Sequence, residues 1–100
     1  MLNISKKQDG RLLTLTLSGR IDTSSAPQLQ AEVESLPEGV THVVMDIEKI
    51  DYISSAGLRV LLNLEQNLEE TGGLLEVSHV SELIRDVFDI TGFLDILHII

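Results

Sequence analysis

Short segments with β-type patterning alternate along this chain with amphipathic helical segments, and this alternation constrains the fold more than any other feature. Two β-type runs, 4–7 and 11–17, flank an Asp-Gly pair that is typical of a hairpin turn. In the second run leucines alternate with polar residues, which predicts a strand with one buried face. The chain as a whole predicts the order β-β-α-β-α-β-α-β, an α/β fold with a mixed sheet whose later strands are parallel and joined by right-handed crossovers.

Three segments have the spacing of apolar residues that predicts helices buried along one face. The first follows Ser24 and Ser25, which can cap it, and is expected to bury Ala26, Leu29, Val33 and Leu36. The second follows residues 54–57 and is expected to bury Leu58, Leu61, Leu62 and Leu68. The water-facing side of this second helix is expected to carry Glu65, Glu69 and Glu70. The third begins after Ser81, ends before Gly92, and is expected to bury Leu83, Ile84, Val87 and Ile90.

Further β-type segments separate and follow these helices. Residues 42–47 are apolar almost throughout, which indicates a central strand, and a second short β-type segment follows at 50–53. Residues 74–77 predict another strand, and 95–100 predict a closing one. Because the length suits one domain and no linker interrupts the pattern, we expect a single α/β domain spanning residues 1–100.

Composition excludes several classes of partner and site. Seven basic and sixteen acidic residues make nucleic acids and anionic membranes poor partners, and residues 51–100 hold nine of the acidic residues but only two of the basic ones. No apolar run approaches the roughly 18 residues of a membrane span, and the N-terminal segment does not resemble a secretory signal. The absence of cysteine excludes disulfides and thiolate metal sites, in keeping with the cytoplasmic location that we expect.

Two polar segments stand where a predicted strand gives way to a predicted helix: 22–25 (DTSS) and 54–57 (SSAG). Such positions attract functional groups because helix N-termini expose unpaired N–H groups. The simplest interpretation of Ser54 or Ser55 is a helix cap, which contributes about 1 kcal/mol. The alternative is a phosphorylation site, since a phosphate of about −1.5 to −2 charge is tolerated at the positive end of a helix and would disrupt an interface centred there.

The sequence offers little support for catalysis or metal binding, so neither an enzyme nor a metal or other cofactor is expected. The three histidines lack the paired spacing of metal ligands. Asp22, Asp46 and Asp51 could converge on Mg²⁺, but no phosphate-binding glycine motif accompanies them, and Asp46 is better interpreted as a hydrogen-bonded structural carboxylate. Ser55 lacks the G-x-S-x-G context and an evident base, which argues against a hydrolase.

Residues 51–62, DYISSAGLRVLL, resemble the signature of STAS domains, typified by bacterial anti-sigma factor antagonists. Three further stretches resemble the family in order and spacing: GRID at 19–22 with SAPQL at 25–29, VVMDI at 43–47, and IRDVFDITGF at 84–93. The resemblance therefore extends from about residue 4 to residue 100.

The resemblance implies a switch that works by binding. In antagonist members the unphosphorylated domain binds an anti-sigma factor that is also a serine kinase, which frees a sigma factor. The kinase then phosphorylates the serine at the start of the second helix and ends the interaction, and a serine phosphatase restores it. Matching on Gly57 and Leu58 places that serine at Ser55, with Asp22 in the adjacent partner-binding loop. The implied partner surface comprises Asp22, Thr23, Ser24, Ser54, Ser55, Gly57, Leu58 and Arg59.

One departure from the family leaves alternatives open. The best-studied antagonists have an aspartate directly before the phosphoserine, whereas this chain has Ser54, which provides a second hydroxyl and an alternate phosphorylation site. As an alternative to its place on the inward stripe, Leu58 could be partly exposed on the first turn together with Arg59, as the apolar and polar edges of a contact patch. The alternative function is a non-switching STAS subunit of a transporter-associated or stress-sensing complex, and nucleotide binding is a weaker third hypothesis.

Overall fold

The computed structural model describes residues 2–100, so that only Met1 of the expected domain 1–100 lies outside the described residues. The strands are β1 (Leu2–Asp9), β2 (Leu12–Ile21), β3 (His42–Ile53), β4 (Leu74–Ser78) and β5 (His98–Ile99). The helices are α1 (Ala26–Glu34), α2 (Ser55–Glu70) and α3 (Glu82–Thr91), followed by a 3₁₀ turn, η1 (Phe93–Asp95).

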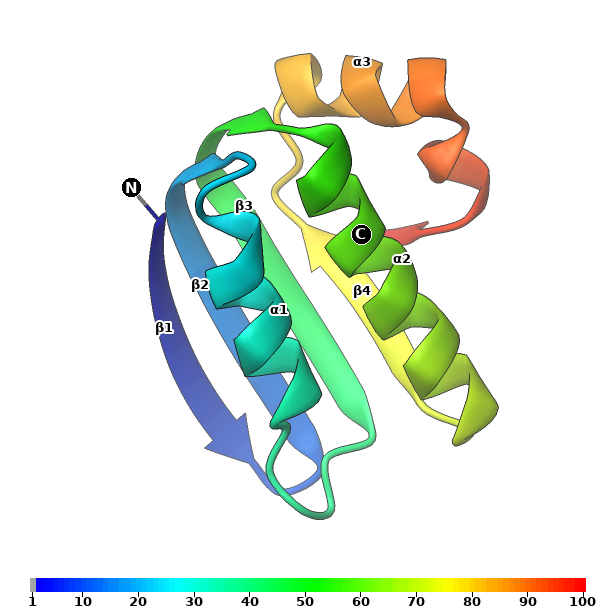
Figure 1. The fold of residues 1–100 in the computed structure, drawn as a ribbon. Coiled ribbons are helices and arrows are strands. Elements are labelled where there is room, and N and C mark those ends of the chain that lie inside the picture. The colour runs from blue at the N-terminus through cyan, green and yellow to red at the C-terminus, as the bar shows by residue number, and fades with distance from the viewer. Residues whose placement is uncertain (1) are drawn as a thin grey trace.

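The strands form one mixed sheet in the order β1-β2-β3-β4-β5. β1 pairs with β2 antiparallel, and every later neighbouring pair is parallel. Helices α1 and α2 cover one face of the sheet, whereas α3 lies across the end at which the parallel strands finish (Figure 1). The predicted element order and mixed sheet are therefore confirmed.

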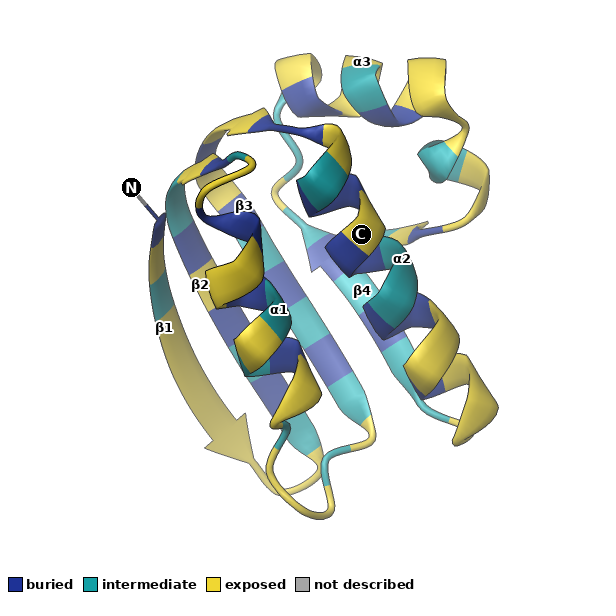
Figure 2. Cartoon of the chain, viewed as in Figure 1, coloured by how far each residue is buried: buried dark blue, intermediate teal, exposed yellow. Residues whose placement is uncertain are grey.

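The core lies between the sheet and the helices and follows the predicted periodicities. Along β2 the leucines at 13, 15 and 17 are at most 2% exposed, and the alternation of buried with less buried residues continues along residues 42–47 of β3 and along β4 (Figure 2). The leucines on the inward face of α2 are Leu58, Leu61, Leu64 and Leu68, whereas Leu62, which was predicted to be buried, is only partly so. Glu65, expected to face water, is instead only 8% exposed. It is buried because it lies on the side of α2 that the C-terminal segment covers, a contact that the helical period does not reveal.

Residues 42–47 and 50–53 belong to one strand rather than two. Ile47, Ile50 and Ile53 are buried with two exposed residues between each pair, so the strand departs from simple alternation without ending. The pairing of β3 with β2 shifts register between Thr16 and Ser18 and again between Gly19 and Arg20. These two irregularities let β3 remain paired with β2 although its burial pattern changes. β1 and β2 likewise extend beyond the predicted runs.

The buried face of α3 differs from the predicted one. Ile84 and Phe88 are buried, whereas Leu83 is 60% and Ile90 is 85% exposed. The helix packs on its Ile84–Phe88 side, where the ring of Phe88 stacks on that of Phe93 at a centroid distance of 6.4 Å. The apolar stripe of α3 is therefore wider than the surface available to cover it.

The ends of α3 agree with the sequence, but the chain after it does not. The Oγ of Ser81 accepts a hydrogen bond from the Ile84 N–H, and Gly92, at φ +82°, ends the helix in the left-handed conformation that favours glycine. The expected closing strand over 95–100 is reduced to His98–Ile99, because the 3₁₀ turn uses the preceding residues to bring the chain back to the sheet.

Candidate functional site

The two polar segments that follow β2 and β3 lie side by side at one edge of the sheet. Ile21 and Ile53 are paired across the two strands, and the Ser54 N–H donates to the Ile21 carbonyl over 2.8 Å. Helices α1 and α2 consequently begin at the same end of the molecule (Figure 1). The two polar turns are therefore neighbours at the carboxyl ends of β2 and β3.

The turn before α1 is organised by the Asp22 carboxylate. Its Oδ1 accepts hydrogen bonds from the N–H of Ser24 at 3.1 Å, the N–H of Ser25 at 2.9 Å and the Ser24 hydroxyl at 2.8 Å. Ser25 does not cap α1 with its side chain; its buried hydroxyl accepts from the Asp22 N–H and donates to the Arg20 carbonyl. The predicted serine cap is thus wrong, because the Ser25 hydroxyl is engaged within the turn by the Asp22 N–H and the Arg20 carbonyl.

These bonds favour the ionised form of Asp22 and predict an acid-sensitive turn. The Ser24 hydroxyl and then the Ser25 N–H lower the pKa of Asp22 to about 2. Since this pKa lies below the value of about 3.9 in an unfolded chain, ionised Asp22 stabilises the fold fully above about pH 3.9, and this stabilisation is lost as the pH falls toward 2.

We expect Asp22→Asn to lower the free energy of unfolding near neutral pH, as measured by urea denaturation. The difference from wild type should shrink as the pH falls from about 3.9 toward 2. Asp51→Asn removes the same charge from an exposed position; an identical pH profile for that variant would contradict the prediction.

The turn before α2 separates the two serines. Ser54 is buried and extended, and its Oγ accepts the Gly57 N–H at 3.1 Å, so that it caps the helix. Ser55 is the first residue of α2 and is exposed. A Cβ at Gly57 would lie 2.6 Å from Cγ2 of Ile21 and 2.9 Å from Cγ1 of Ile53, so only glycine allows α2 to begin so close to the strand ends. Ser54 therefore holds the helix start, and Ser55 presents a hydroxyl to solvent.

Alanine substitutions are expected to distinguish the two serines. Ser54→Ala removes the cap and should lower the free energy of unfolding by about 1 kcal/mol. Ser55→Ala should change it by less than about 0.5 kcal/mol, because Ser55 is exposed and alanine suits a first helical turn. Urea denaturation of the two variants beside wild type measures both values. Equal losses would contradict the separate roles assigned to the serines.

The remaining predicted site residues divide into exposed and buried ones. Thr23, Ser24 and Arg59 are exposed as expected. Leu58 is only 7% exposed, which confirms its predicted place on the buried face of α2 and rules out the alternative that it forms the apolar edge of a surface patch. Its position three residues before Leu61 places it on the inward face of α2, where it packs in the core.

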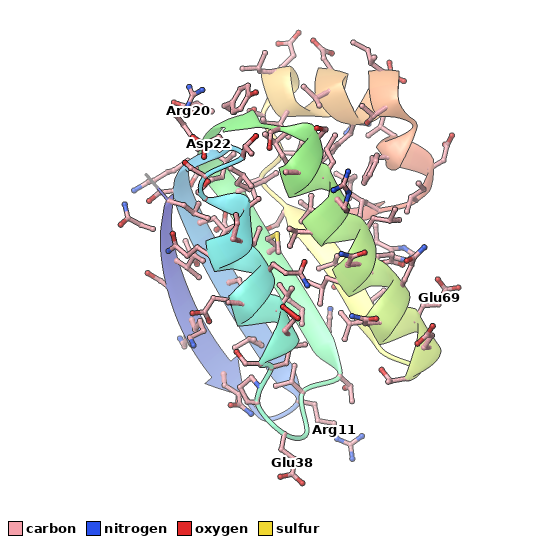
Figure 3. The ribbon with its side chains drawn as sticks, in the orientation of Figure 1. Arg11, Arg20, Asp22, Glu38 and Glu69 are labelled. Carbon is pink, nitrogen blue, oxygen red and sulfur yellow. The ribbon has the colours of Figure 1, made fainter. Side chains whose placement is uncertain are left out.

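An arginine–tyrosine pair at the same end was not among the predicted residues. The Arg20 guanidinium lies 4.4 Å above the ring centroid of Tyr52, and Tyr52 is 41% exposed. Figure 3 shows Arg20 and Asp22 close together at this end of the molecule. The sequence contained one sign of this contact, because the aromatic Tyr52 stands just before Ile53 and Ser54 at the end of the predicted strand. The contact itself depends on the strand register, which pairs Arg20 with Tyr52.

The acidic residues considered for Mg²⁺ do not form a metal site. Asp46 accepts the Glu48 N–H and lies 3.1 Å from Nδ1 of His79, which is the structural role expected of it. Across residues 2–100, no group of three or more histidine, aspartate or glutamate side chains is placed to hold a metal ion. None of the helices in this range is long and apolar enough to cross a membrane.

The sequence matches the profile of the STAS domain over residues 3–100. The chain belongs to the STAS family. BtrV of Bordetella bronchiseptica, a proposed anti-sigma factor antagonist, is 41% identical over 91 residues, which cover 90% of this chain and 78% of BtrV. The anti-sigma-B factor antagonist of Bacillus subtilis is 31% identical over 98 residues, covering 98% of this chain and 90% of that protein.

Solved structures confirm the STAS fold. The Bacillus anti-sigma factor antagonist SpoIIAA in its unphosphorylated form gives a TM-score of 0.78 at 18% identity, over 98% of this chain and 87% of that one. Its phosphorylated form gives 0.77 at 19% identity, over 98% and 91%. At such low identity the likeness concerns the fold alone.

Proposed function

We propose that this STAS protein is an anti-sigma factor antagonist whose binding to an anti-sigma factor is switched by phosphorylation of Ser55. The observation that carries the proposal is the exposed Ser55 hydroxyl on the first turn of α2, beside Ser54, whose hydroxyl is buried and engaged. The relative at 31% identity is named as an anti-sigma factor antagonist, and BtrV, at 41% identity, is named as a proposed one. Both names support the same role here.

The partner-binding surface is built around Ser55 from both turns. Asp22, Thr23, Ser24 and Arg59 supply its polar groups, and the Arg20–Tyr52 pair extends it with an aromatic ring that presents both a face and a hydroxyl. The buried Ser54, Gly57 and Leu58 act from beneath, because they hold the start of α2 in position. Of the eight residues implied by the family, five therefore contact the partner directly in this proposal and three are positioning residues.

In this mechanism the domain acts by binding in the cytoplasm. The anti-sigma factor is a serine kinase that first binds the surface around Ser55 and then transfers a phosphoryl group to its hydroxyl. The resulting dianion lies at the positive end of α2, where the fold tolerates it, but it cannot be dehydrated within the former interface without a large cost. A separate serine phosphatase removes the phosphate and restores binding.

A comparative pull-down tests the proposal. We immobilise wild type, Ser55→Ala and Ser55→Asp on resin and incubate each with extract of the source organism. Ser35→Asp serves as the control, because it adds the same charge at the far end of α1. We expect an ATP-binding kinase to be retained by wild type, Ser55→Ala and the control and to be clearly depleted with Ser55→Asp. Transport or scaffold proteins retained equally by all four would overturn the switch in favour of a non-switching subunit of a transporter-associated or stress-sensing complex.

A further inference from the structure

Arg59 is the one basic residue of α2, and it lies about one helical turn beyond Ser55. Both residues are exposed, whereas Gly57, Leu58 and Val60 around them are buried. Residues four apart on a helix share a face, with their Cβ atoms about 5–6 Å apart. Ser55 and Arg59 therefore lie on the same solvent-facing strip of α2.

The geometry of a helix brings the Arg59 side chain toward Ser55. Every Cα–Cβ bond of an α-helix is tilted toward the N-terminus, so a long side chain covers the turn before its own residue. For Arg59 that turn contains Ser55. At this spacing an acidic group on the N-terminal side of a basic one is also the more favourable order. A phosphate on Ser55 would therefore be within reach of the Arg59 guanidinium, in the favourable order.

The Arg59 guanidinium is not committed to a carboxylate. None of the ion pairs within residues 2–100 involves it. The positions one helical turn before and after it, residues 55, 56, 62 and 63, are not acidic, so α2 itself offers no partner. The other arginine described at this end, Arg20, belongs to β2 and has its guanidinium over the ring of Tyr52. Arg59 is therefore available to an anion that arrives on its own helix.

We infer that Arg59 is an intramolecular ligand for a phosphate on Ser55, to whose oxygens its guanidinium donates charge-assisted hydrogen bonds. Arginine suits this role because its planar group can donate to two oxygens at once, which a lysine ammonium does less well. The unphosphorylated surface presents a free hydroxyl and a free guanidinium, whereas the phosphorylated surface presents the two groups paired. Phosphorylation therefore changes two contacts of the partner-binding surface. The inference rests on the proposed modification of Ser55.

Phosphorus NMR of the phosphorylated domain tests the inference. Phosphoserine is inserted at position 55 during synthesis, so that neither the kinase nor the anti-sigma factor is needed. The second ionisation of a phosphoserine occurs near pH 6, and a paired cation favours the dianion. We expect Arg59→Gln to move the midpoint of this titration to higher pH by about 0.3 or more. A midpoint equal to that of the wild type would overturn the inference.

A second arginine provides the matched control. Arg11 is exposed and lies at the opposite end of the molecule from Asp22 (Figure 3), so Arg11→Gln removes the same charge far from Ser55. It should move the midpoint by less than about 0.1, because solvent and salt screen distant surface charges. Arg59→Lys keeps the charge and should give a midpoint between those of wild type and Arg59→Gln. Equal shifts in Arg11→Gln and Arg59→Gln would show that only overall charge matters, and would overturn the inference.

Thermal melts of the same proteins give a second measurement. The gain in melting temperature on phosphorylation should be about 2–4 °C smaller in Arg59→Gln than in wild type, because the intrahelical pair is lost. An equal gain would contradict the pair. Failure of the pair and failure of the switch are distinguishable. Unchanged midpoints and melts overturn the role of Arg59 and leave the switch at Ser55 in place, whereas partner binding that ignores the phosphate overturns the switch and leaves the measured pair.

Discussion

Phosphorylated on Ser55, the domain is expected to lose at least about 100-fold in affinity for its anti-sigma factor while its own stability does not fall. In the free protein the phosphate is solvated, and its interaction with the N-terminus of α2 contributes about 0.3–1 kcal/mol. In the complex the same dianion would have to be dehydrated, which costs several kcal/mol unless the partner pairs it. Calorimetric titration with the partner and a thermal melt of the free domain measure the two quantities.

Charge position separates a switch at Ser55 from a general effect of added charge. Ser55→Asp carries less charge than phosphate and should reproduce only part of the loss, and Ser55→Ala should bind like wild type. Ser35→Asp, at the far end of α1, should also bind like wild type. Comparable losses for the aspartates at 35 and 55 would refute an interface centred on Ser55. Undiminished binding of the phosphorylated protein would refute the switch itself.

Phe88→Ala is expected to lower the free energy of unfolding by about 3–5 kcal/mol, the typical cost of removing a fully buried aromatic ring. The ring is 0% exposed and stacks on Phe93, so its loss leaves a cavity beneath α3. For a domain of this size, the melting temperature should fall by at least about 12 °C. Thermal and urea denaturation measure the loss.

The neighbouring apolar positions of α3 provide the control for this prediction. Leu83→Ala and Ile90→Ala should each change the free energy of unfolding by less than about 0.5 kcal/mol, because both side chains are largely exposed. The sequence alone predicts the opposite ranking, with both residues buried. If Ile90→Ala proved as destabilising as Phe88→Ala, the orientation of α3 described here would be wrong.

Local patterns in the sequence were sufficient to predict most of the fold. The alternating leucines of β2, the apolar run of β3 and the stripe along α2 each correspond to an observed buried face. They succeed because burial of one face follows from the period of the strand or helix itself. The Ser81 cap and the Gly92 terminus were predicted for the same reason, since each acts on residues within one helical turn.

The sequence pointed to the two turns of the candidate site but not to the separate roles of their residues. Four segments in family register pointed to Asp22 and Ser55, and the sheet brings their turns together. The sequence could not decide which of Ser54 and Ser55 is engaged, because that depends on a backbone angle at the end of β3 and on the closeness of Ile21 and Ile53 to Gly57. The Arg20–Tyr52 contact likewise depends on the strand register.

The sequence by itself therefore determined the element order and the STAS family, because these follow from local periodicity and from motifs in order along the chain. Only the tertiary structure decided which side of α3 is buried, that Glu65 is buried rather than facing water, and that Ser55 is the exposed serine. The physical reason is that burial of a given side chain depends on which distant segment packs against it. A residue and its sequence neighbours do not contain that information.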